Sequence, residues 1–336
     1  MKVAVFSTES YDRHFLDLSN LSFGGNNHQF VYYENRLDPK TASLARRCQA
    51  ICAFVNDDLG AETLRILAMQ GIKLITLRCT GFNNVDLAEA SKLDIKVLRV
   101  SAYSPYAVAE HAVGLILMLN RKLYRAYNRV RDDNFSLTGL LGFDLHGKTC
   151  GVIGTGKIGL CFAKIMSGFG CNVLGYDTQP NSEFTELANA TYVELEQLLS
   201  RSDIISLHCP LLPQTYHLIN RDTIALMKPG VMLINTSRGA LVDTLATIEG
   251  IKSHRIGYLG IDVYEEEEEL FFRDWTGKII QDDTFQLLQS FHNVVITAHQ
   301  AFFTENALSD ITKTTIENLT DFEQGNPLRN EVSVKQ

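Results

Sequence analysis

The sequence has no long apolar run and no closely spaced cysteine pair. Its longest apolar run, residues 112–119, contains Gly114 and is far too short to span a bilayer. The seven cysteines are scattered without a C-x-x-C pair, so neither a zinc site nor a disulfide framework is expected. Their odd number fits a reducing compartment. Residues 1–6 are typical of a β-strand and not of a signal peptide. We therefore expect a cytoplasmic protein with no bound metal and no membrane contact.

The sequence also lacks an excess of positive charge. It carries 31 Lys and Arg against 39 Asp and Glu, and the net charge of −8 repels polyanions, so we expect no nucleic-acid partner. Neither an internal repeat nor a low-complexity linker is evident. A hydrophobic content of 45% and a charged content of 21% over 336 residues predict a globular protein with a sizeable core and room for two domains.

The most informative stretch lies at residues 150–159. An apolar run leads into the pattern G-x-G-x-x-G, formed by Gly154, Gly156 and Gly159, and a helical pattern follows. Glycine permits the tight turn, the close approach of backbone to a pyrophosphate, and the packing of helix on strand. The next predicted strand ends in Asp177, eighteen residues after the last of these glycines, where a carboxylate would hold a ribose 2′-hydroxyl. This context favours a dinucleotide site over a purely structural glycine turn.

Asp177 also indicates which dinucleotide binds. A carboxylate accepts hydrogen bonds from a 2′-hydroxyl and repels a 2′-phosphate, and residues 178–182 contain no arginine that could receive that phosphate. The sequence thus predicts NAD and not NADP. His208, at the end of another predicted strand, is either a packed loop residue or a cofactor contact, and we favour the contact.

Strand and helix patterns alternate along the chain, which predicts an α/β fold with two parallel-sheet domains. Helical patterns occupy residues 59–70 and 304–324. Strands are predicted at 3–6, 29–33, 50–55, 74–77 and 96–100, and then near 150–153, 172–176, 203–207, 231–235, 258–262 and 294–297.

Two segments between the predicted strands at 96–100 and 150–153 have distinct patterns. Residues 104–130 are apolar nearly all round and are predicted to form one long buried helix that begins near Pro105. Glu110 and His111 lie on it, and we expect them to form a buried, hydrogen-bonded pair. Residues 131–147 show no clean periodicity and are predicted to form an irregular arm that packs on another subunit.

Three predicted strands in the second half are followed by residues that suit one reaction. Arg238 follows the first, the glutamate run 265–269 follows the second, and His299 follows the third. Each has an ordinary explanation: an ion pair of Arg238 with Asp243, a solvated acidic loop, and a packed histidine. Arginine binds carboxylates bidentately, and histidine exchanges protons near neutral pH. Together, at the edge of a sheet that binds a nicotinamide, they predict hydride transfer to a 2-oxo acid.

These motifs resemble those of the D-isomer-specific 2-hydroxyacid dehydrogenases, and the resemblance runs from end to end of the chain. It is carried by GTGKIG at 154–159, NTSRG at 235–239, DVYEEE at 262–267 and TAHQAF at 297–302. It implies two Rossmann-like or flavodoxin-like domains. The NAD domain, 103–299, would be inserted in a substrate domain made of 1–102 and 300–336. Closure about the two chain crossings would exclude water from the hydride path.

The resemblance implies a role for each matching residue. Arg238 would bind the substrate carboxylate, His299 would be the acid/base, and Glu267, selected among the glutamates by family spacing alone, would be its partner. The loop 78–84 would meet the carboxylate with backbone N–H groups. Implied substrate contacts are Arg78, Thr80, Gly81, Phe82, Tyr103, Arg238 and His299. Cofactor contacts, from the glycine pattern and the resemblance together, are Gly154, Gly156, Lys157, Ile158, Gly159, Asp177, His208, Cys209, Pro210, Thr215, Thr236, Ser237, Arg238 and Asp262.

Two positions depart from the common family pattern. Ala298 and Gln300 flank the histidine, where many relatives have Pro and then Thr or Ser. Glutamine at position 300 resembles the pattern of the lactate-forming branch, whose bacterial fermentative members reduce pyruvate with NADH. The resemblance therefore implies reversible reduction of pyruvate to D-lactate by a homo-oligomer, a dimer or tetramer, with 104–130 and 131–147 as interface candidates.

Two other functions stay open at this point. One is an enzyme of the same family with another 2-oxo acid, such as a 2-hydroxyisocaproate or phenyllactate dehydrogenase, although the bulky Tyr103, Phe302 and Phe303 favour a small pocket. The other is an NAD-sensing binding protein on the same fold, as in the corepressor branch. The presence of the arginine, glutamate and histidine argues against a purely binding role.

Overall fold

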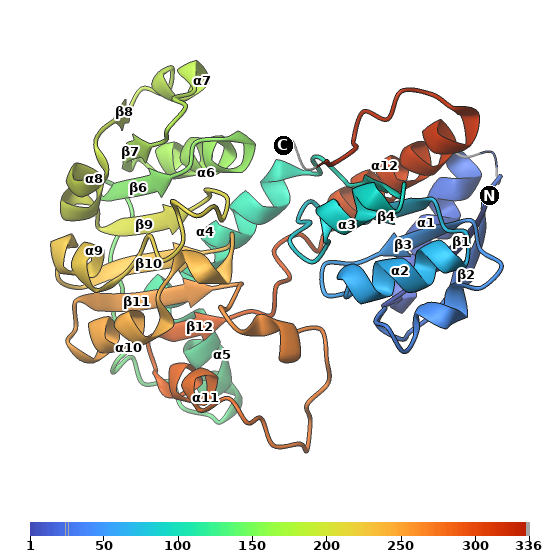
Figure 1. Ribbon diagram of the computed structural model, residues 1–336. Helices are drawn as coiled ribbons and strands as arrows, with labels where there is room; N and C mark the ends of the chain where they lie inside the picture. The colour runs from blue at the N-terminus through green and yellow to red at the C-terminus, as the bar shows by residue number, and fades with distance from the viewer. Residues whose placement is uncertain (24, 26, 334–336) are drawn as a thin grey trace. The chain divides into compact units, whose positions relative to one another are not determined.

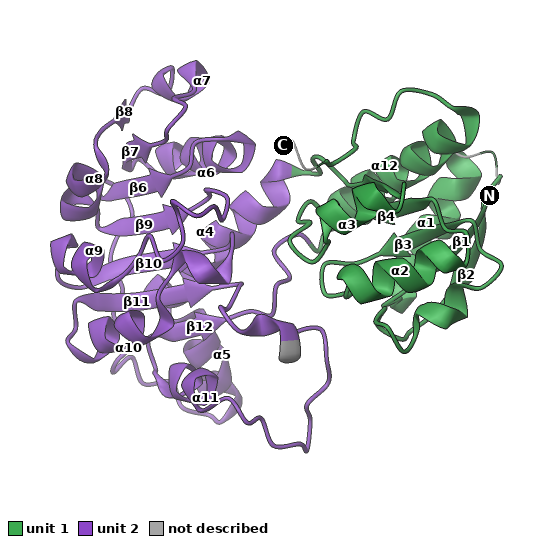
Figure 2. Cartoon of the chain, in the orientation of Figure 1, with its two compact units in different colours: residues 1–104, 303–336 green, residues 105–302 purple. Residues whose placement is uncertain are grey.

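The computed structural model describes residues 1–23, 25 and 27–333. The chain forms two compact units, one made of residues 1–104 and 303–336 and the other of residues 105–302 (Figure 2). Each unit is built on one parallel sheet, so the α/β fold with two parallel-sheet domains is confirmed.

The first unit contains a five-stranded sheet of order β2-β1-β3-β4-β5 (Figure 1). All neighbouring strands pair in parallel. Both β3 and β4 are buried at every position, which explains their unbroken apolar character. The strands are β1 (Lys2–Val5), β2 (Gln29–Tyr32), β3 (Ala50–Ala53), β4 (Leu74–Leu77) and β5 (Lys96–Leu98). The helices are α1 (Ser10–Ser22), η1 (Ala42–Ala45), α2 (Ala61–Met69), α3 (Leu87–Lys92) and α12 (Glu305–Gln324).

The last helix, α12, belongs to the first unit although it follows the second in sequence. It packs on α1, where Ser19 Oγ and Thr312 Oγ1 lie 2.7 Å apart and both residues are buried. Leu319 shares a hydrophobic core with Val3 and Leu16. Residues from both ends of the chain thus stabilise one core.

The second unit contains a seven-stranded sheet of order β12-β11-β10-β9-β6-β7-β8, again entirely parallel. This is the strand order of dinucleotide-binding domains with one strand added at an edge. The order reverses between β6 and β9, and ligands bind such sheets at the carboxyl ends of the strands at that point. The strands are β6 (Thr149–Ile153), β7 (Asn172–Tyr176), β8 (Ala190–Tyr192), β9 (Ile204–Leu207), β10 (Val231–Asn235), β11 (Ile256–Ile261) and β12 (Val294–Ile296).

Helices cover both faces of this second sheet. Ile204 and Met232 pack on one face with residues of α4 and α6, while Ile205 and Leu233 pack on the other face with residues of α8, α9, α10 and α11. Alternate residues of each strand therefore serve two cores. The helices are α4 (Pro105–Arg121), α5 (Leu123–Arg131), α6 (Lys157–Gly168), α7 (Ser182–Thr185), α8 (Leu195–Arg201), α9 (Arg221–Leu226), η2 (Gly239–Leu241), α10 (Thr244–Lys252), η3 (Glu267–Glu269) and α11 (Asp283–Ser290).

Every predicted strand is present, with bounds within two residues of those expected. The sequence pattern misses β8, because this edge strand of three residues has no apolar run. Among the described residues, no helix combines the length and the apolar character needed to cross a membrane. All seven cysteines are buried free thiols.

Residues 104–130 do not form a single helix, so that prediction is wrong. The segment breaks at Lys122, whose backbone is left-handed with φ 50° and ψ 39°. Lys122 Nζ donates to the carbonyl oxygen of Leu141 and lies 5.6 Å from the ring centroid of Tyr258. These partners lie far along the chain, so helical periodicity could not reveal the break. Residues 132–147, which follow α5, are irregular as predicted.

Candidate active site

The glycine-rich turn follows β6 and begins α6. Gly154 has a left-handed backbone, with φ 92°, and a Cβ there would lie 2.5 Å from the backbone nitrogen of Cys209. A Cβ on Gly159 would lie 1.9 Å from the carbonyl oxygen of Gly154. Gly156, the N-cap of α6, faces open space. The turn is thus tightly packed on one side, and its middle glycine leaves room for a pyrophosphate at the helix N-terminus, beside Lys157 and Ile158.

A groove of about 410 Å³ lies beside this turn. It occupies the carboxyl ends of β6, β7 and β9, where the strand order reverses. Its lining is Ile153, Gly154, Gly156, Tyr176, Asp177, Thr178, His208, Cys209, Pro210, Leu212, Gln214, Thr215 and Leu218. Sequence reasoning misses six of these, namely Ile153, Tyr176, Thr178, Leu212, Gln214 and Leu218. Their only signal was a position at or soon after a strand end.

Asp177 holds its carboxylate in a fixed position at this groove. Its Oδ2 accepts hydrogen bonds from the backbone nitrogen of Thr155 at 2.7 Å and from Thr155 Oγ1 at 3.2 Å. Its Oδ1 accepts one from the backbone nitrogen of Gln179 at 2.9 Å. A half-buried carboxylate held in this way is ready to receive ribose hydroxyls, which fits an unphosphorylated dinucleotide.

His208 lines the groove, but its ring contacts buried residues of the same unit. Nε2 lies 2.9 Å from Ser206 Oγ, and the ring packs against Phe162 of α6 with centroids 4.8 Å apart. Burial lowers the pKa of His208 to about 3, so the ring is neutral at physiological pH. The adjacent Cys209 accepts a hydrogen bond from Ser237 Oγ through its carbonyl oxygen at 2.7 Å. Thr215 Oγ1 donates to the carbonyl oxygen of Pro210 at 2.7 Å and so shapes the same loop.

His299 and Glu267 form a close pair. Nδ1 of His299 lies 2.7 Å from Oε1 of Glu267, and the two side chains are 18% and 20% exposed. The backbone nitrogen of Tyr264 donates to Oε2 of Glu267 at 2.9 Å. Because Nδ1 is engaged by the carboxylate, Nε2 is the ring nitrogen left for a reacting group. Phe272, which the sequence did not single out, lies against the His299 ring with centroids 5.7 Å apart.

Asp262 fixes the backbone that carries His299. Its carbonyl oxygen accepts from the His299 nitrogen at 2.7 Å. Its carboxylate accepts from Thr297 Oγ1 and from the backbone nitrogens of Gln300 and Ala301. Burial acts to raise the pKa of Asp262, but these hydrogen bonds and one to His111 outweigh it and lower the pKa. The carboxylate is fully buried, so its first role is to hold this segment.

The expected pair of Glu110 and His111 does not form, which corrects that prediction. Glu110 is exposed, whereas His111 Nε2 lies 2.9 Å from Thr297 Oγ1 and 3.4 Å from Asp262 Oδ1. Adjacent residues of a helix point in directions about 100° apart, so they do not face each other. His111 instead links α4 to the segment that carries His299.

Arg238 follows β10, and its ion pair with Asp243 is absent from the described part of the chain. The Asp243 carboxylate instead caps α10 by accepting from the backbone nitrogen of Ala246 at 2.9 Å. Arg238 Nη1 donates only to the carbonyl oxygen of Ser237, at 2.7 Å, and no described carboxylate pairs with it. The neighbouring Thr236 Oγ1 is buried without a partner in the described chain, so it can form a hydrogen bond with a ligand.

The structure places the predicted site residues of the second unit at the carboxyl ends of the strands of one sheet. The strands β10, β11 and β12 are neighbours, and Arg238, Glu267 and His299 follow their carboxyl ends in that order. The fingerprint turn and Asp177 lie at the same edge, after β6 and β7. The predicted substrate residues before Ser104 belong to the other unit.

In the first unit, Arg78 is buried and already paired. Its backbone nitrogen donates to the carbonyl oxygen of Ala53 at 3.0 Å, and its Nε donates to Asp12 Oδ1 at 3.0 Å. Arg78 is therefore an anchor beneath its loop; its Nη1 is buried without a partner in the described chain, and its contact with substrate stays a prediction. The N–H groups of residues 80–82 take part in no hydrogen bond within the described chain, so they are free to bind an anion. Tyr103 is half-buried and lies near the end of residues 1–104, the first of the two segments that make up this unit.

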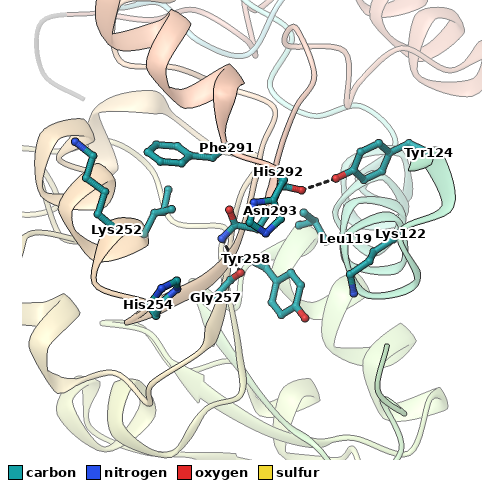
Figure 3. A pocket seen from close by; sticks show the side chains of 11 residues that line it. Leu119, Lys122, Tyr124, Lys252, His254, Gly257, Tyr258, Phe291, His292 and Asn293 are labelled. Carbon is teal, nitrogen blue, oxygen red and sulfur yellow. Dashed lines mark hydrogen bonds between the residues drawn. The ribbon is translucent and has the colours of Figure 1, made fainter. Parts of the chain in front are cut away.

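A second cavity, of about 270 Å³, lies at the opposite edge of the second sheet (Figure 3). Gly257 at the start of β11 and Asn293 just before β12 line it, together with residues of α10 and the break at Lys122. The amino groups of Lys122 and Lys252 lie on opposite sides of the cavity and do not converge (Figure 3). The cavity lies at the amino ends of β11 and β12, whereas parallel sheets bind their ligands at the carboxyl ends of the strands.

Comparisons with known proteins agree with this geometry. The model of the NAD binding domain of the D-isomer specific 2-hydroxyacid dehydrogenases matches residues 113–301. D-lactate dehydrogenase of Escherichia coli (strain K12) is 51% identical over 99% of this chain and 100% of its own length. The solved pyruvate reductase of Chlamydomonas reinhardtii superposes with a TM-score of 0.92 at 45% identity, over 98% of each chain. The structure of D-2-hydroxyisocaproate dehydrogenase gives 0.85 at 30% identity, over 99% of this chain and 100% of that one.

A dinucleotide-binding sheet whose strands end in a histidine–glutamate pair and in an arginine that no described carboxylate pairs with defines an NAD-dependent dehydrogenase. Within that class, the chain belongs to the D-isomer specific 2-hydroxyacid dehydrogenase family.

Replacing Asp177 by Ala should weaken NADH binding about tenfold or more, because a charge-assisted hydrogen bond contributes about 1.5–3 kcal/mol. The same change should lessen the discrimination against NADPH, since the repelling charge is gone. Fluorescence titration with both cofactors measures the two dissociation constants. Glu183→Ala, which removes an exposed acid from the following helix α7, is the control and should leave both unchanged. An unaltered NADH to NADPH preference in Asp177→Ala would remove the ribose role.

Proposed function

We propose that this protein reduces pyruvate reversibly to D-lactate with NADH. The observation that carries the proposal is the His299–Glu267 pair, 2.7 Å apart. The two residues follow β12 and β11, and β11 lies beside β10, which Arg238 follows. The identity of about half of all residues to a D-lactate dehydrogenase, along the full length of both chains, supports pyruvate among the 2-oxo acids.

Arg238 binds the substrate carboxylate in this proposal. A guanidinium offers two parallel N–H donors that match a carboxylate, and Arg238 has no described carboxylate that competes for them. In the first unit, the N–H groups of residues 80–82, which form no hydrogen bond within the described chain, would also bind a carboxylate, and Tyr103 stays a proposed substrate contact. The first unit would thus be the substrate domain and the second the NAD-binding domain.

His299 donates the proton in the reduction and removes it in the oxidation. Glu267 holds Nδ1, so Nε2–H points to the substrate carbonyl oxygen, and the carboxylate stabilises the charged imidazolium. NADH, when bound, supplies the hydride to the carbonyl carbon. Glu267 keeps its own place through the hydrogen bond from Tyr264, and His299 through those to Asp262. The chain therefore supplies orientation and a proton at one atom.

A steady-state assay across a panel of 2-oxo acids tests the proposal. With NADH, kcat/KM should be higher for pyruvate than for 2-oxoisocaproate and phenylpyruvate. A preference for a larger acid would assign the chain to another activity of the family. No turnover by folded protein that binds NADH would favour an NAD-sensing role.

Replacing His299 by Gln should lower kcat by about 10²–10⁴-fold, the usual contribution of a general acid. The dissociation constant for NADH should stay within about threefold, because the ring does not form the dinucleotide groove. Absorbance at 340 nm and fluorescence titration measure the two effects. His254→Gln, an exposed histidine of the same unit, is the control. An undiminished kcat in His299→Gln would refute the assignment.

We also propose that the protein is a homo-oligomer that uses α5 and the segment 131–147. No residue of α5 is buried, yet Leu123, Tyr127 and Val130 form an exposed stripe on it. Leu137 and Leu141 are 82% and 87% exposed. Apolar side chains gathered in this way favour burial against a second copy.

Changing both Leu137 and Leu141 to Glu should shift the molar mass in light scattering toward that of a single chain, because charge replaces the apolar contact. Leu245→Glu, at a 67% exposed position in α10, should leave the mass unchanged. A wild-type protein that is already a single chain would contradict the proposal.

A further inference from the structure

A second histidine–glutamate pair shares a loop with the first and has no part in the roles above. His217 Nε2 donates to Glu265 Oε1 at 2.6 Å, and the side chains are 27% and 20% exposed. Glu265 lies two residues before Glu267 in the same loop after β11. His217 lies in the loop after β9, two residues beyond Thr215, which lines the dinucleotide groove. The pair thus connects the groove loop with the loop that carries the glutamate partner of His299.

Glu265 also connects a third loop. Its Oε2 accepts from Thr244 Oγ1 at 2.9 Å and from the Thr244 backbone nitrogen at 3.4 Å. Thr244 begins α10, directly after the segment 236–243 that carries Arg238. One carboxylate therefore joins the groove loop, the arginine segment and its own loop.

Backbone contacts reinforce the same connection. The backbone nitrogen of His217 donates to the carbonyl oxygen of Ala240 at 2.9 Å, and that of Ile219 donates to the carbonyl oxygen of Leu241 at 3.0 Å. Gly239 packs directly on the loop of Glu265, since a Cβ there would lie 2.2 Å from the carbonyl carbon of Tyr264. Residues 239–241, which follow Arg238, thus contact both of the other loops.

The ring of His217 is held by more than its carboxylate. Tyr216 stacks on it with centroids 4.0 Å apart and an interplanar angle of 18°. Asn220 Nδ2 donates to the carbonyl oxygen of His217 at 3.0 Å. His217 keeps a left-handed backbone, with φ 48°, which costs energy in a residue other than glycine. Such a conformation persists where surrounding contacts hold it, as they do here.

We propose that His217 and Glu265 are positioning residues that couple the dinucleotide groove to Arg238. In this proposal, the bound cofactor restricts the motion of the loop 208–215. The hydrogen bonds of His217 and Glu265 then restrict the motion of the segment 236–243, so that the Arg238 guanidinium is already in place when a carboxylate binds. Neither residue lines the groove or belongs to the catalytic pair, so they act through Arg238 and Glu267. The inference rests on the proposed role of Arg238 as the carboxylate ligand.

His217→Ala should raise KM for pyruvate about tenfold or more with a smaller change in kcat, because misplacement of a binding group weakens substrate binding first. The melting temperature should change little, since a partly exposed ion pair contributes little to stability. His217→Gln keeps a donor where Nε2 lies and should restore most of the lost affinity. Glu265→Ala should match His217→Ala, and the double variant should be no worse than either.

The matched control is the exposed ion pair of Arg221 with Glu249, which joins α9 to α10 in the same unit. Arg221→Ala and Glu249→Ala should leave KM unchanged. A merely structural role of His217 would instead lower kcat and the melting temperature together and would show no rescue by Gln.

A binding experiment separates this inference from the proposed reaction. Oxamate, an unreactive isostere of pyruvate, is titrated by calorimetry with and without saturating NADH. The wild-type protein should bind oxamate more tightly with NADH, and His217→Ala should lose most of that enhancement. An enhancement that is absent in the wild type or unchanged in His217→Ala overturns the inference. If the wild-type protein binds oxamate more tightly with NADH but does not reduce pyruvate, only the proposed reaction is overturned.

Discussion

The buried carboxylate of Asp262 determines where the backbone of His299 lies. A charge without water must be matched by donors, and here the donors are Thr297 and the backbone of Gln300 and Ala301. Satisfying Asp262 therefore folds the chain after β12 into one conformation, in which His299 has a left-handed backbone with φ 52°. The backbone position of His299 follows from this electrostatic requirement, and the Glu267 carboxylate then holds the ring through Nδ1.

Close backbone packing performs a similar task on the cofactor side. Gly154 lies against Cys209, and Gly239 lies against Tyr264, at distances that exclude a side chain. Each contact joins loops that follow different strands of one sheet. Because the loops pack on one another, a ligand that orders one of them affects the others. The pair of His217 and Glu265 adds directional hydrogen bonds to this packing.

Much of the fold could be predicted from local pattern, because parallel strands buried on both faces must be apolar along their length. The prediction fails where local pattern is weak. The edge strand β8 is three residues long, and the break at Lys122 depends on Leu141 and Tyr258. For the site, position after a strand was enough to select Arg238 and His299. The choice of Glu267 needed family spacing, and Phe272, His111 and His217 gave no local signal because their partners lie far away in sequence.

The sequence alone determined the fold class, the dinucleotide fingerprint with an acidic residue after the next strand, and the residue types suited to a 2-oxo acid. These properties depend on residues that lie within one turn or at one strand end, where the spacing along the sequence determines the positions in space. Tertiary structure alone decided that α12 packs with α1, that Arg78 is an internal anchor paired with Asp12, and that His111 pairs with Thr297 and not with Glu110. Each is a choice among partners far apart in the chain, and such choices are made by burial and hydrogen bonding, which no local pattern encodes.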